Sequence, residues 1–131
     1  YYISYLSSFM KLNKYRDLIA WQKSIEFAEK IYLMTKQFPM EERFGLAAQL
    51  KRSAVSIPSN IAEGAGRESK KEFSQFLSIS MGSCFEAETQ LILANKIGII
   101  PNEELNNLLQ ASDEIQKILV GLKKSLINRI N

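Results

Sequence analysis

Apolar residues recur every three or four positions along most of this chain, which is the spacing of one face of an α-helix. The first such stretch runs from Asp17 to Lys36 and carries two apolar stripes. One stripe is Leu18, Trp21, Ile25, Ala28, Tyr32 and Thr35, and the other is Phe27, Ile31, Met34 and Phe38. At about 100° per residue, the two stripes form an apolar arc roughly 200° wide. A helix with one buried side needs only about 100°, so this helix is predicted to be buried on two sides.

The width of that arc leaves two interpretations open, with equal weight. Either the helix lies deep inside its own bundle, or its second side contacts another subunit. Under the second interpretation, the residues expected at the oligomer interface are Phe27, Ile31 and Met34.

The second helical stretch, from Glu41 to Glu63, contains a proline in its interior. Its apolar positions step by four, three and four residues, at Leu50, Ala54, Ile57 and Ile61. Pro58 removes a backbone donor from this run and costs about 3 kcal/mol or more. Small polar side chains nearby could satisfy the carbonyl of Ala54, which loses its partner; they are Ser53, Ser56, Ser59 and Asn60. We therefore predict a core-facing helix with a kink at Pro58.

Two further helices are marked by local start and stop signals. Ser69 and Glu72 form a capping box and Gly98 is a natural C-terminal stop, which predicts a third helix between them. Small residues in its middle predict a close approach by the bent second helix, at Ser80, Gly82, Ser83 and Cys84. A fourth helix is predicted to begin at Pro101-Asn102 and to keep the periodicity of a bundle seam, through Leu105, Leu108, Ser112, Ile115, Leu119, Leu122 and Leu126.

Short connections between these long helices favour antiparallel neighbours. The predicted fold is therefore all-α, an antiparallel up-down-up-down four-helix bundle with its second helix kinked at Pro58. The bundle domain is expected over residues 15–131, after an N-terminal leader over residues 1–14 that could be flexible. Because Met10 looks like a natural start, residues 1–9 are expected to be an upstream addition, and a segment that docks on a partner is the alternative.

Composition excludes several kinds of chemistry. The chain has no histidine and one cysteine, Cys84. The usual di-iron sites of helical bundles and the Ser-His-Asp triad need histidine, and zinc sites need several Cys or His ligands. We therefore expect no catalytic residues, no metal site and no cofactor. Glu63, beside Asn60, is the best candidate for a functional carboxylate, although an ion pair at the helix end or between subunits is the favoured role.

A single cysteine gives no internal disulfide framework, and no apolar run approaches the ~20 residues that cross a bilayer. These features indicate a cytoplasmic protein without membrane contact.

Basic side chains are expected to collect at one end of the bundle. The start of helix one, the turn between helices two and three, and the end of helix four share that end in this topology. The candidates for nucleic-acid contacts there are Arg67, Lys70, Lys71, Lys123, Lys124 and Arg129. Lys51 and Arg52 are expected to extend this surface along helix two. The opposite end is expected to be acidic, with Glu41, Glu42, Glu103 and Glu104.

Helix dipoles offer a competing explanation for this charge layout, because they favour anions near the N-terminus of a helix and cations near its C-terminus. They account for the basic residues of the fourth helix. They do not account for Arg67, Lys70 and Lys71, since cations are unfavourable at a helix start. A basic end that contacts phosphates is therefore a hypothesis of equal weight.

Several segments of the chain have distinctive sequences. The most specific is Ser56-Ile57-Pro58-Ser59-Asn60-Ile61-Ala62-Glu63-Gly64. The others are Tyr15-Arg16-Asp17-Leu18-Ile19-Ala20-Trp21-Gln22, Phe38-Pro39, Glu42-Arg43-Phe44-Gly45-Leu46, Gln49-Leu50-Lys51-Arg52 and Gly82-Ser83. Together they resemble the four-helix-bundle proteins that are encoded by intervening sequences in 23S ribosomal RNA genes. The resemblance covers about residues 15–100. Where the family often has Glu-Leu-Glu-Thr, this chain has Glu86-Ala87-Glu88-Thr89.

The resemblance implies an antiparallel four-helix bundle and a homopentamer, a barrel of bundles with a central channel. The family is similar to the accessory proteins of diversity-generating retroelements, which associate with nucleic acid and a reverse transcriptase. It supplies no catalytic residues. Two hypotheses follow: a non-enzymatic oligomer that binds nucleic acid, with RNA favoured over DNA, or a structural adaptor that binds a protein partner such as a reverse transcriptase.

Overall fold

A computed structural model describes residues 14–130 of the chain and, within the last turn of its final helix, the backbone alone for residues 128–130. Over this range the chain forms four α-helices and two short 3-10 helices. They are η1 (Lys14–Asp17), α2 (Ile19–Thr35), η2 (Met40–Glu42), α3 (Leu46–Ala65), α4 (Lys70–Lys96) and α5 (Asn102–Ile130). The predicted leader lies outside the described residues except for Lys14, which begins η1.

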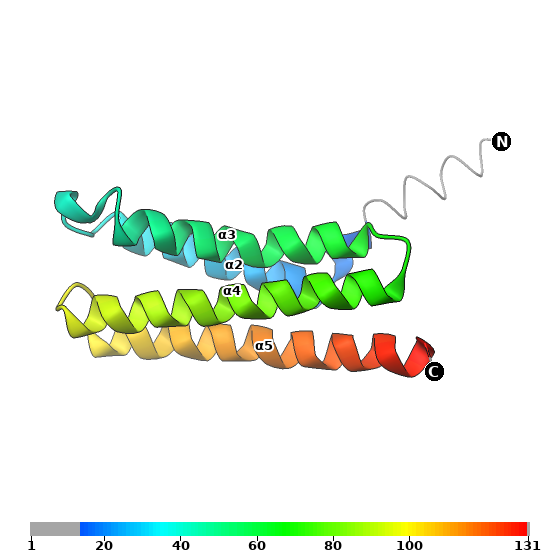
Figure 1. Ribbon diagram of the computed structural model, residues 1–131. Helices are drawn as coiled ribbons and strands as arrows, with labels where there is room; N and C mark the ends of the chain where they lie inside the picture. The colour runs from blue at the N-terminus through cyan, green and yellow to red at the C-terminus, as the bar shows by residue number, and fades with distance from the viewer. Residues whose placement is uncertain (1–13, 131) are drawn as a thin grey trace.

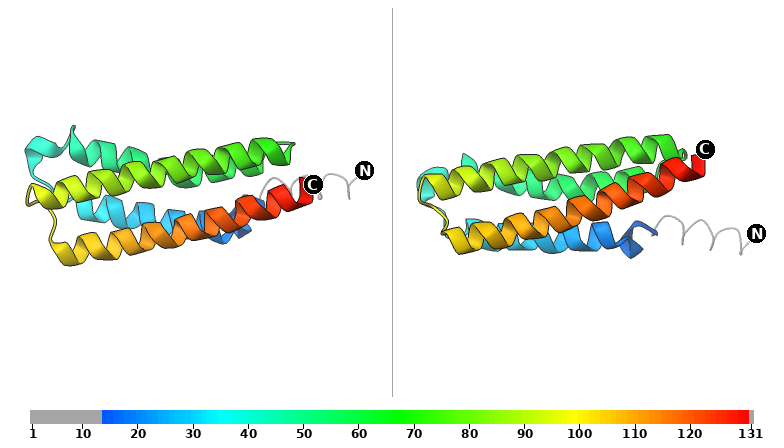
Figure 2. Two further views of the ribbon diagram at one scale, coloured as in Figure 1. Left: turned by 60° about the horizontal axis from the view of Figure 1, so that its bottom comes forward. Right: turned by 90° about the horizontal axis from the view of Figure 1, so that it is seen from below.

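The four α-helices pack side by side as a bundle, which confirms the predicted all-α fold. Each neighbouring pair makes contact, α2 with α3, α3 with α4, α4 with α5, and α5 with α2. Consecutive helices run in opposite directions along the bundle (Figure 1). The start of α2, the α3–α4 turn and the end of α5 therefore lie at one end, and the α2–α3 and α4–α5 connections lie at the other (Figure 2).

A single apolar core runs through the bundle and receives side chains from every α-helix. Its largest fully buried members are Phe27 and Ile31 of α2, Leu50, Ile57 and Ile61 of α3, Leu77 and Leu91 of α4, and Ile115 and Leu119 of α5. Burial of apolar side chains of this size contributes about 1.5–3 kcal/mol each, so the core is the main source of stability.

The assignment of an oligomer interface to the second stripe of helix one is wrong. Phe27, Ile31 and Met34 are 1%, 0% and 4% exposed within a single chain, so they have no surface to offer a second subunit. The sequence shows two stripes on α2 but does not reveal which of them faces the other helices. The residues of α2 that remain exposed belong to its outer side and include Ile25 and Tyr32.

The second helix begins later than predicted. Residues 40–42 form the separate 3-10 helix η2, and α3 starts only at Leu46, after Gly45 with φ −103° and ψ −108°. The Oε1 atom of Glu42 accepts a hydrogen bond of 3.4 Å from the backbone N–H of Leu46. Glu42 therefore stabilises the N-terminus of α3 from the turn that precedes this helix, and not from the first residues of the helix itself.

The start and stop signals predicted for the third helix, Ser69 with Glu72 and Gly98, lie at the two ends of α4. Ser69 Oγ accepts a 3.0 Å hydrogen bond from the N–H of Glu72, and it also donates to Glu72 Oε1 at 3.2 Å. At the other end, Gly98 has φ +85°. Its N–H donates to the carbonyl of Asn95, and the N–H of Ile99 donates to that of Ala94. This paired arrangement is a Schellman motif, in which the left-handed glycine ends the helix.

Candidate nucleic-acid interface

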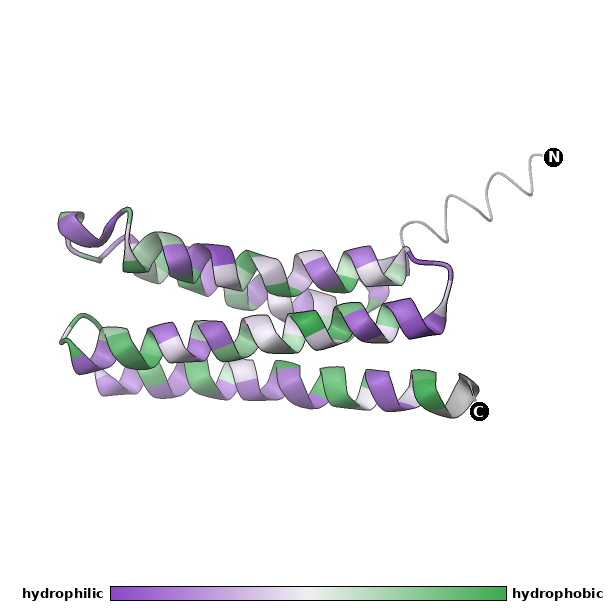
Figure 3. Ribbon diagram, in the orientation of Figure 1, coloured by the Kyte–Doolittle hydropathy of each residue, from purple (hydrophilic) through white to green (hydrophobic). Residues whose placement is uncertain are grey.

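The basic residues predicted to contact nucleic acid lie at the end of the bundle that contains the α3–α4 turn (Figure 1). Arg67, Lys70 and Lys71 are exposed in or beside that turn, which is strongly hydrophilic in Figure 3. On α5, Lys124 is exposed and Lys123 is half-buried. Arg129 lies in the last turn of α5, and its side chain is outside the described part of the chain.

Two of these cations are held by neighbours within the chain. Arg67 forms a 3.0 Å ion pair with Glu63, one turn earlier, and its guanidinium lies 4.9 Å from the centre of the Phe76 ring. Lys123 Nζ donates a 2.6 Å hydrogen bond to Ser78 Oγ and so connects α5 to α4. Arg67 and Lys123 therefore contribute to the packing of this end as well as to its charge.

Lys70, Lys71 and Lys124 are exposed to solvent. Across residues 14–130, no carboxylate lies within ion-pair distance of Lys70, Lys71 or Lys124. The 3-10 helix η1 packs against α2 and α3 at the same end and adds the exposed Lys14 and Arg16. This surface is called the basic end below.

The opposite end is less acidic than the sequence suggested. Beside its four glutamates it carries Lys36, Arg43 and Lys96. Lys51, which was expected to extend the basic end, lies near the start of α3 and therefore also belongs to this opposite end. The bundle keeps a positive end, but the predicted negative end is close to neutral.

The residues of the family-like motif lie along the contact between α3 and α4. Ser56 Oγ shares a 2.8 Å hydrogen bond with Ser83 Oγ, and Ser80 Oγ donates to the carbonyl of Ile57 at 2.9 Å. Asn60 Nδ2 donates back to the carbonyl and hydroxyl of Ser56.

The residues of this motif differ in burial. Ile57, Pro58 and Gly64 are buried, whereas Ser59 and Glu63 are exposed. Most of the motif therefore joins two helices.

The proline at the centre of this motif does not end the helix, because α3 is assigned as helix on both sides of Pro58. The kink itself stays a prediction. The small polar side chains behave differently from expectation: within residues 14–130, none donates to the carbonyl of Ala54. Ser53 Oγ instead donates to Gln90 Oε1 of α4 at 3.0 Å, so Ser53, like Ser56, binds across the helix contact, whereas Asn60 binds within α3.

Gly64 allows α3 to approach α4 closely. A Cβ atom at this position would lie 2.6 Å from the Cβ of Phe76 and 3.0 Å from Cδ1 of Phe73. In the middle of α4, the expected close approach to α3 involves Ser80 and Ser83, whose hydroxyls bond to Ile57 and Ser56, whereas the buried Cys84 lies against Ser112 of α5. Gly82 does not take part, since a Cβ there would meet no atom within 4 Å.

A polar cluster that the sequence analysis missed lies between α4 and α5. Glu88 Oε2 accepts hydrogen bonds from Ser112 Oγ, at 2.7 Å, and from Gln116 Nε2. Gln116 Nε2 also donates to Ser112 Oγ at 3.1 Å. The i, i+4 spacing of Ser112 and Gln116 on one face of α5 was the available signal. All three side chains satisfy one another, so the cluster fixes the packing of the two helices.

Cys84 lies beside this cluster and is fully buried. Burial raises the pKa of its thiol from 9.0 to about 12, with a smaller upward contribution from Glu88 and an opposing one from the hydrogen bond to Ser112. Because the thiolate is the reactive form, Cys84 is inert chemically while the bundle is folded.

We expect Cys84 to react with a chromogenic disulfide reagent at pH 8 only after unfolding in denaturant. An unfolded thiol ionises near pH 9 and the folded one near pH 12, so the folded state holds more protons between these values. This contribution to stability is fully present below pH 9 and is lost as the pH rises toward 12. Fast labelling of the native protein at pH 8 would contradict this assignment.

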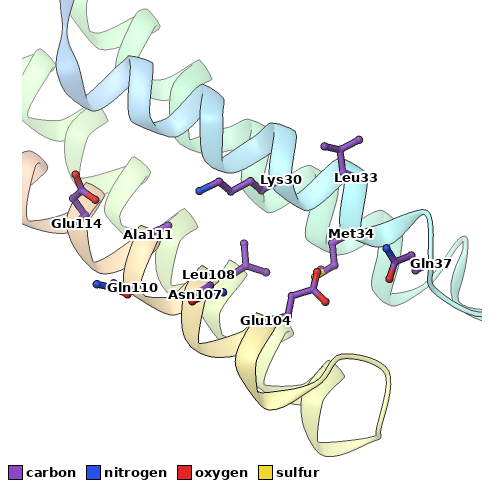
Figure 4. Close-up of a pocket in the computed structure, with 10 residues that line it drawn as sticks. All are labelled: Lys30, Leu33, Met34, Gln37, Glu104, Asn107, Leu108, Gln110, Ala111 and Glu114. Carbon is purple, nitrogen blue, oxygen red and sulfur yellow. The ribbon is translucent and has the colours of Figure 1, made fainter.

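An open groove of about 580 Å³ lies between α2 and α5 (Figure 4). Met34 and Leu108 form its apolar floor, while Lys30, Glu104 and Glu114 surround it. Its charges are mixed. Within residues 14–130, no group of three or more His, Cys, Asp or Glu side chains could hold a metal ion. No helix in the same range combines the length and apolar character needed to cross a bilayer.

The fold and this surface define a small four-helix-bundle protein with a basic end. The family described as 23S rRNA-intervening sequence protein matches residues 16–121, and the chain belongs to this family. The match extends beyond residue 100 and includes most of α5.

A solved structure supports the same assignment. It is the crystal structure of a protein with unknown function from the S23 ribosomal protein family of Bacteroides thetaiotaomicron VPI-5482, to which this chain is similar with 31% identity and a TM-score of 0.75. The similarity covers 81% of this chain and 99% of that one. Among curated proteins, none matches the chain.

Proposed function

We propose that this protein is a non-enzymatic nucleic-acid-binding protein, with RNA favoured over DNA, which acts as a homo-oligomer and contacts phosphates through its basic end. The observation that carries the proposal is the exposure of Lys70, Lys71 and Lys124, none of which has a carboxylate partner among residues 14–130. Lysines that meet phosphates release condensed counterions and bind without regard to sequence.

The position of two of these lysines favours a role in binding over a role in folding. Lys70 and Lys71 are the first two residues of α4, where a cation opposes the helix dipole by about 0.3–1 kcal/mol. Lys124 lies more than one turn before Ile130, the last residue of α5, where the dipole has little effect. The unfavourable positions of Lys70 and Lys71 therefore support a ligand as the reason for these two lysines.

Oligomerisation would place several basic ends on one nucleic-acid strand, so that contacts that are weak in a single chain add to a higher overall affinity. Several copies of the basic end on one strand bind through avidity, which can raise the overall affinity by about 10²–10⁴. The resemblance to the family points to five copies. Exposed apolar side chains on the outer face of α4 give a second copy surface to bury; they include Ile79, Phe85 and Leu93.

The direct test is to purify the protein, measure its mass in solution and titrate it against labelled RNA and DNA strands of equal sequence. The proposal expects a defined oligomer that binds both polymers, with RNA bound more tightly. A protein that binds neither polymer at low salt would contradict it.

A structural adaptor remains the second candidate, because α2 exposes Ile19, Tyr32 and Leu33 on its outer side. A partner such as a reverse transcriptase could bury them. Recovery of one specific protein partner after nuclease treatment would favour this function over nucleic-acid binding.

A further inference from the structure

A second positively charged site lies at the opposite end of the bundle, where α2 connects to α3. The connection encloses a pocket of about 270 Å³. Three cations line it: Lys36 from the end of α2, Arg43 from the connection and Lys51 from α3. At 1.5 Å per residue along α3, this pocket is roughly 24 Å from Arg67 at the basic end. It is therefore separate from the site of the proposed function.

No acidic side chain offsets these charges inside the pocket. Its remaining lining is Thr35, Phe38, Pro39, Met40 and Ala47. The nearby Glu42 is directed to the start of α3, where its Oε1 accepts from the N–H of Leu46. Within residues 14–130, none of the three cations forms an ion pair. Like charges around one cavity repel one another, and an anion inside it would relieve that repulsion.

Helix dipoles do not explain the arrangement. Lys36 follows the last residue of α2, where a cation is favourable, but Arg43 lies just ahead of α3, where a cation is unfavourable. Arg43 also carries a planar fork of donors, which suits the oxygens of a phosphate. Lys51 is held in place over the Tyr32 ring, with Nζ 5.4 Å from its centre.

An aromatic side chain stands beside the pocket and is open to solvent. Phe44 is 88% exposed, and the guanidinium of Arg43 lies 5.5 Å from the centre of its ring. A side chain so exposed contributes little to folding. Exposed aromatic rings next to basic residues are the surfaces on which nucleotide bases stack.

We propose that Lys36, Arg43 and Lys51 form a pocket for the phosphate group of a nucleotide, with Phe44 as the platform for its base. The phosphate belongs either to a free nucleotide or to the end of a strand. Both sources share the same chemistry, an anionic phosphate joined to a sugar and a base. The pocket's size suits one such group and not a longer segment of backbone.

The test uses calorimetric titration of the full chain, at low salt, with adenosine 5′-monophosphate and with adenosine. We expect the monophosphate to bind and adenosine to bind at least about tenfold more weakly, because the phosphate carries the charged contacts. Arg43→Gln combined with Lys51→Gln is expected to weaken monophosphate binding by about tenfold or more. Equal binding of the two probes to the wild-type protein would overturn the proposal.

Two controls isolate the pocket. Lys96→Gln removes an exposed cation from the same end that does not line the pocket, and it should leave monophosphate binding within about twofold. The second control, Lys70→Glu with Lys71→Glu, changes the basic end and should also leave monophosphate binding unchanged. The proposal for the pocket and the proposal for the basic end can therefore fail independently. Circular dichroism verifies that each variant keeps its helix content. A pocket variant that alters the oligomer mass and not nucleotide affinity would assign this corner to a subunit contact and overturn the proposal.

A final comparison separates the two sources of phosphate. A short RNA with a 5′-phosphate is titrated beside the same RNA with a 5′-hydroxyl. Tighter binding of the phosphorylated strand than of the hydroxyl strand supports a strand end as the ligand. Equal binding of the two strands supports a free nucleotide.

Discussion

Replacing Gly64 with alanine is expected to destabilise the bundle by about 1–3 kcal/mol, the usual cost of overpacking a core. The new Cβ would lie 2.6 Å from the Cβ of Phe76 and 3.0 Å from the ring of Phe73. The first of these atoms is fixed to the backbone of α4, so it cannot move aside as the tip of a long side chain can. The two helices must separate, and the core contacts on both sides of position 64 weaken.

The measurement is chemical denaturation followed by circular dichroism, with Gly82→Ala as the matched control. Gly82 is also a helical glycine, but a Cβ there meets no atom within 4 Å. Alanine should therefore stabilise the helix at position 82 by up to about 1 kcal/mol, through its higher helix propensity. If Gly64→Ala proved as stable as the wild-type protein, the close contact of α3 and α4 would be wrong.

Reversing the charges of Lys70 and Lys71 to glutamate is expected to weaken RNA binding by at least about tenfold at physiological salt, because each chain loses two phosphate contacts. The loss should be similar for every RNA sequence, since phosphate contacts carry no sequence information. Fluorescence anisotropy with labelled RNA measures it.

The same substitutions should leave the fold intact or make it slightly more stable. Acidic residues in the first turn of α4 complement the helix dipole by about 0.3–1 kcal/mol each. Lys30→Glu with Lys96→Glu is the matched control, because both lysines are exposed and lie away from the basic end. Unchanged affinity in the Lys70 and Lys71 variant, or an equal loss in the control, would remove the basic end from the binding site.

The sequence was sufficient for features that depend on local geometry. The four helices follow from periodicity, and the ends of the third follow from Ser69 and Gly98, which act on backbone groups within a few residues. The separation of charge along the bundle was predictable only in part, because it depends on which turns lie at the same end of the bundle. The up-down-up-down topology predicted the basic end. The opposite end was predicted to be more acidic than it is.

Features that depend on contacts between helices could not be predicted. The two stripes of α2 were visible, but only the packed bundle shows that Phe27 and Ile31 face inward. Gly82 was expected to take part in the close approach of two helices and Gly64 was not, yet only Gly64 lies where two helices meet closely. The pocket of Lys36, Arg43 and Lys51 was invisible because a turn brings together residues from three different elements.

Binding of RNA measured as a function of salt tests the central claim most directly. The wild-type protein is titrated with a labelled single strand at several salt concentrations between about 50 and 200 mM. The account predicts that the logarithm of the affinity falls linearly with the logarithm of the salt concentration, by about 0.7 for each phosphate contacted. Absence of binding, or an affinity that does not change with salt, would contradict recognition of phosphates by the basic end.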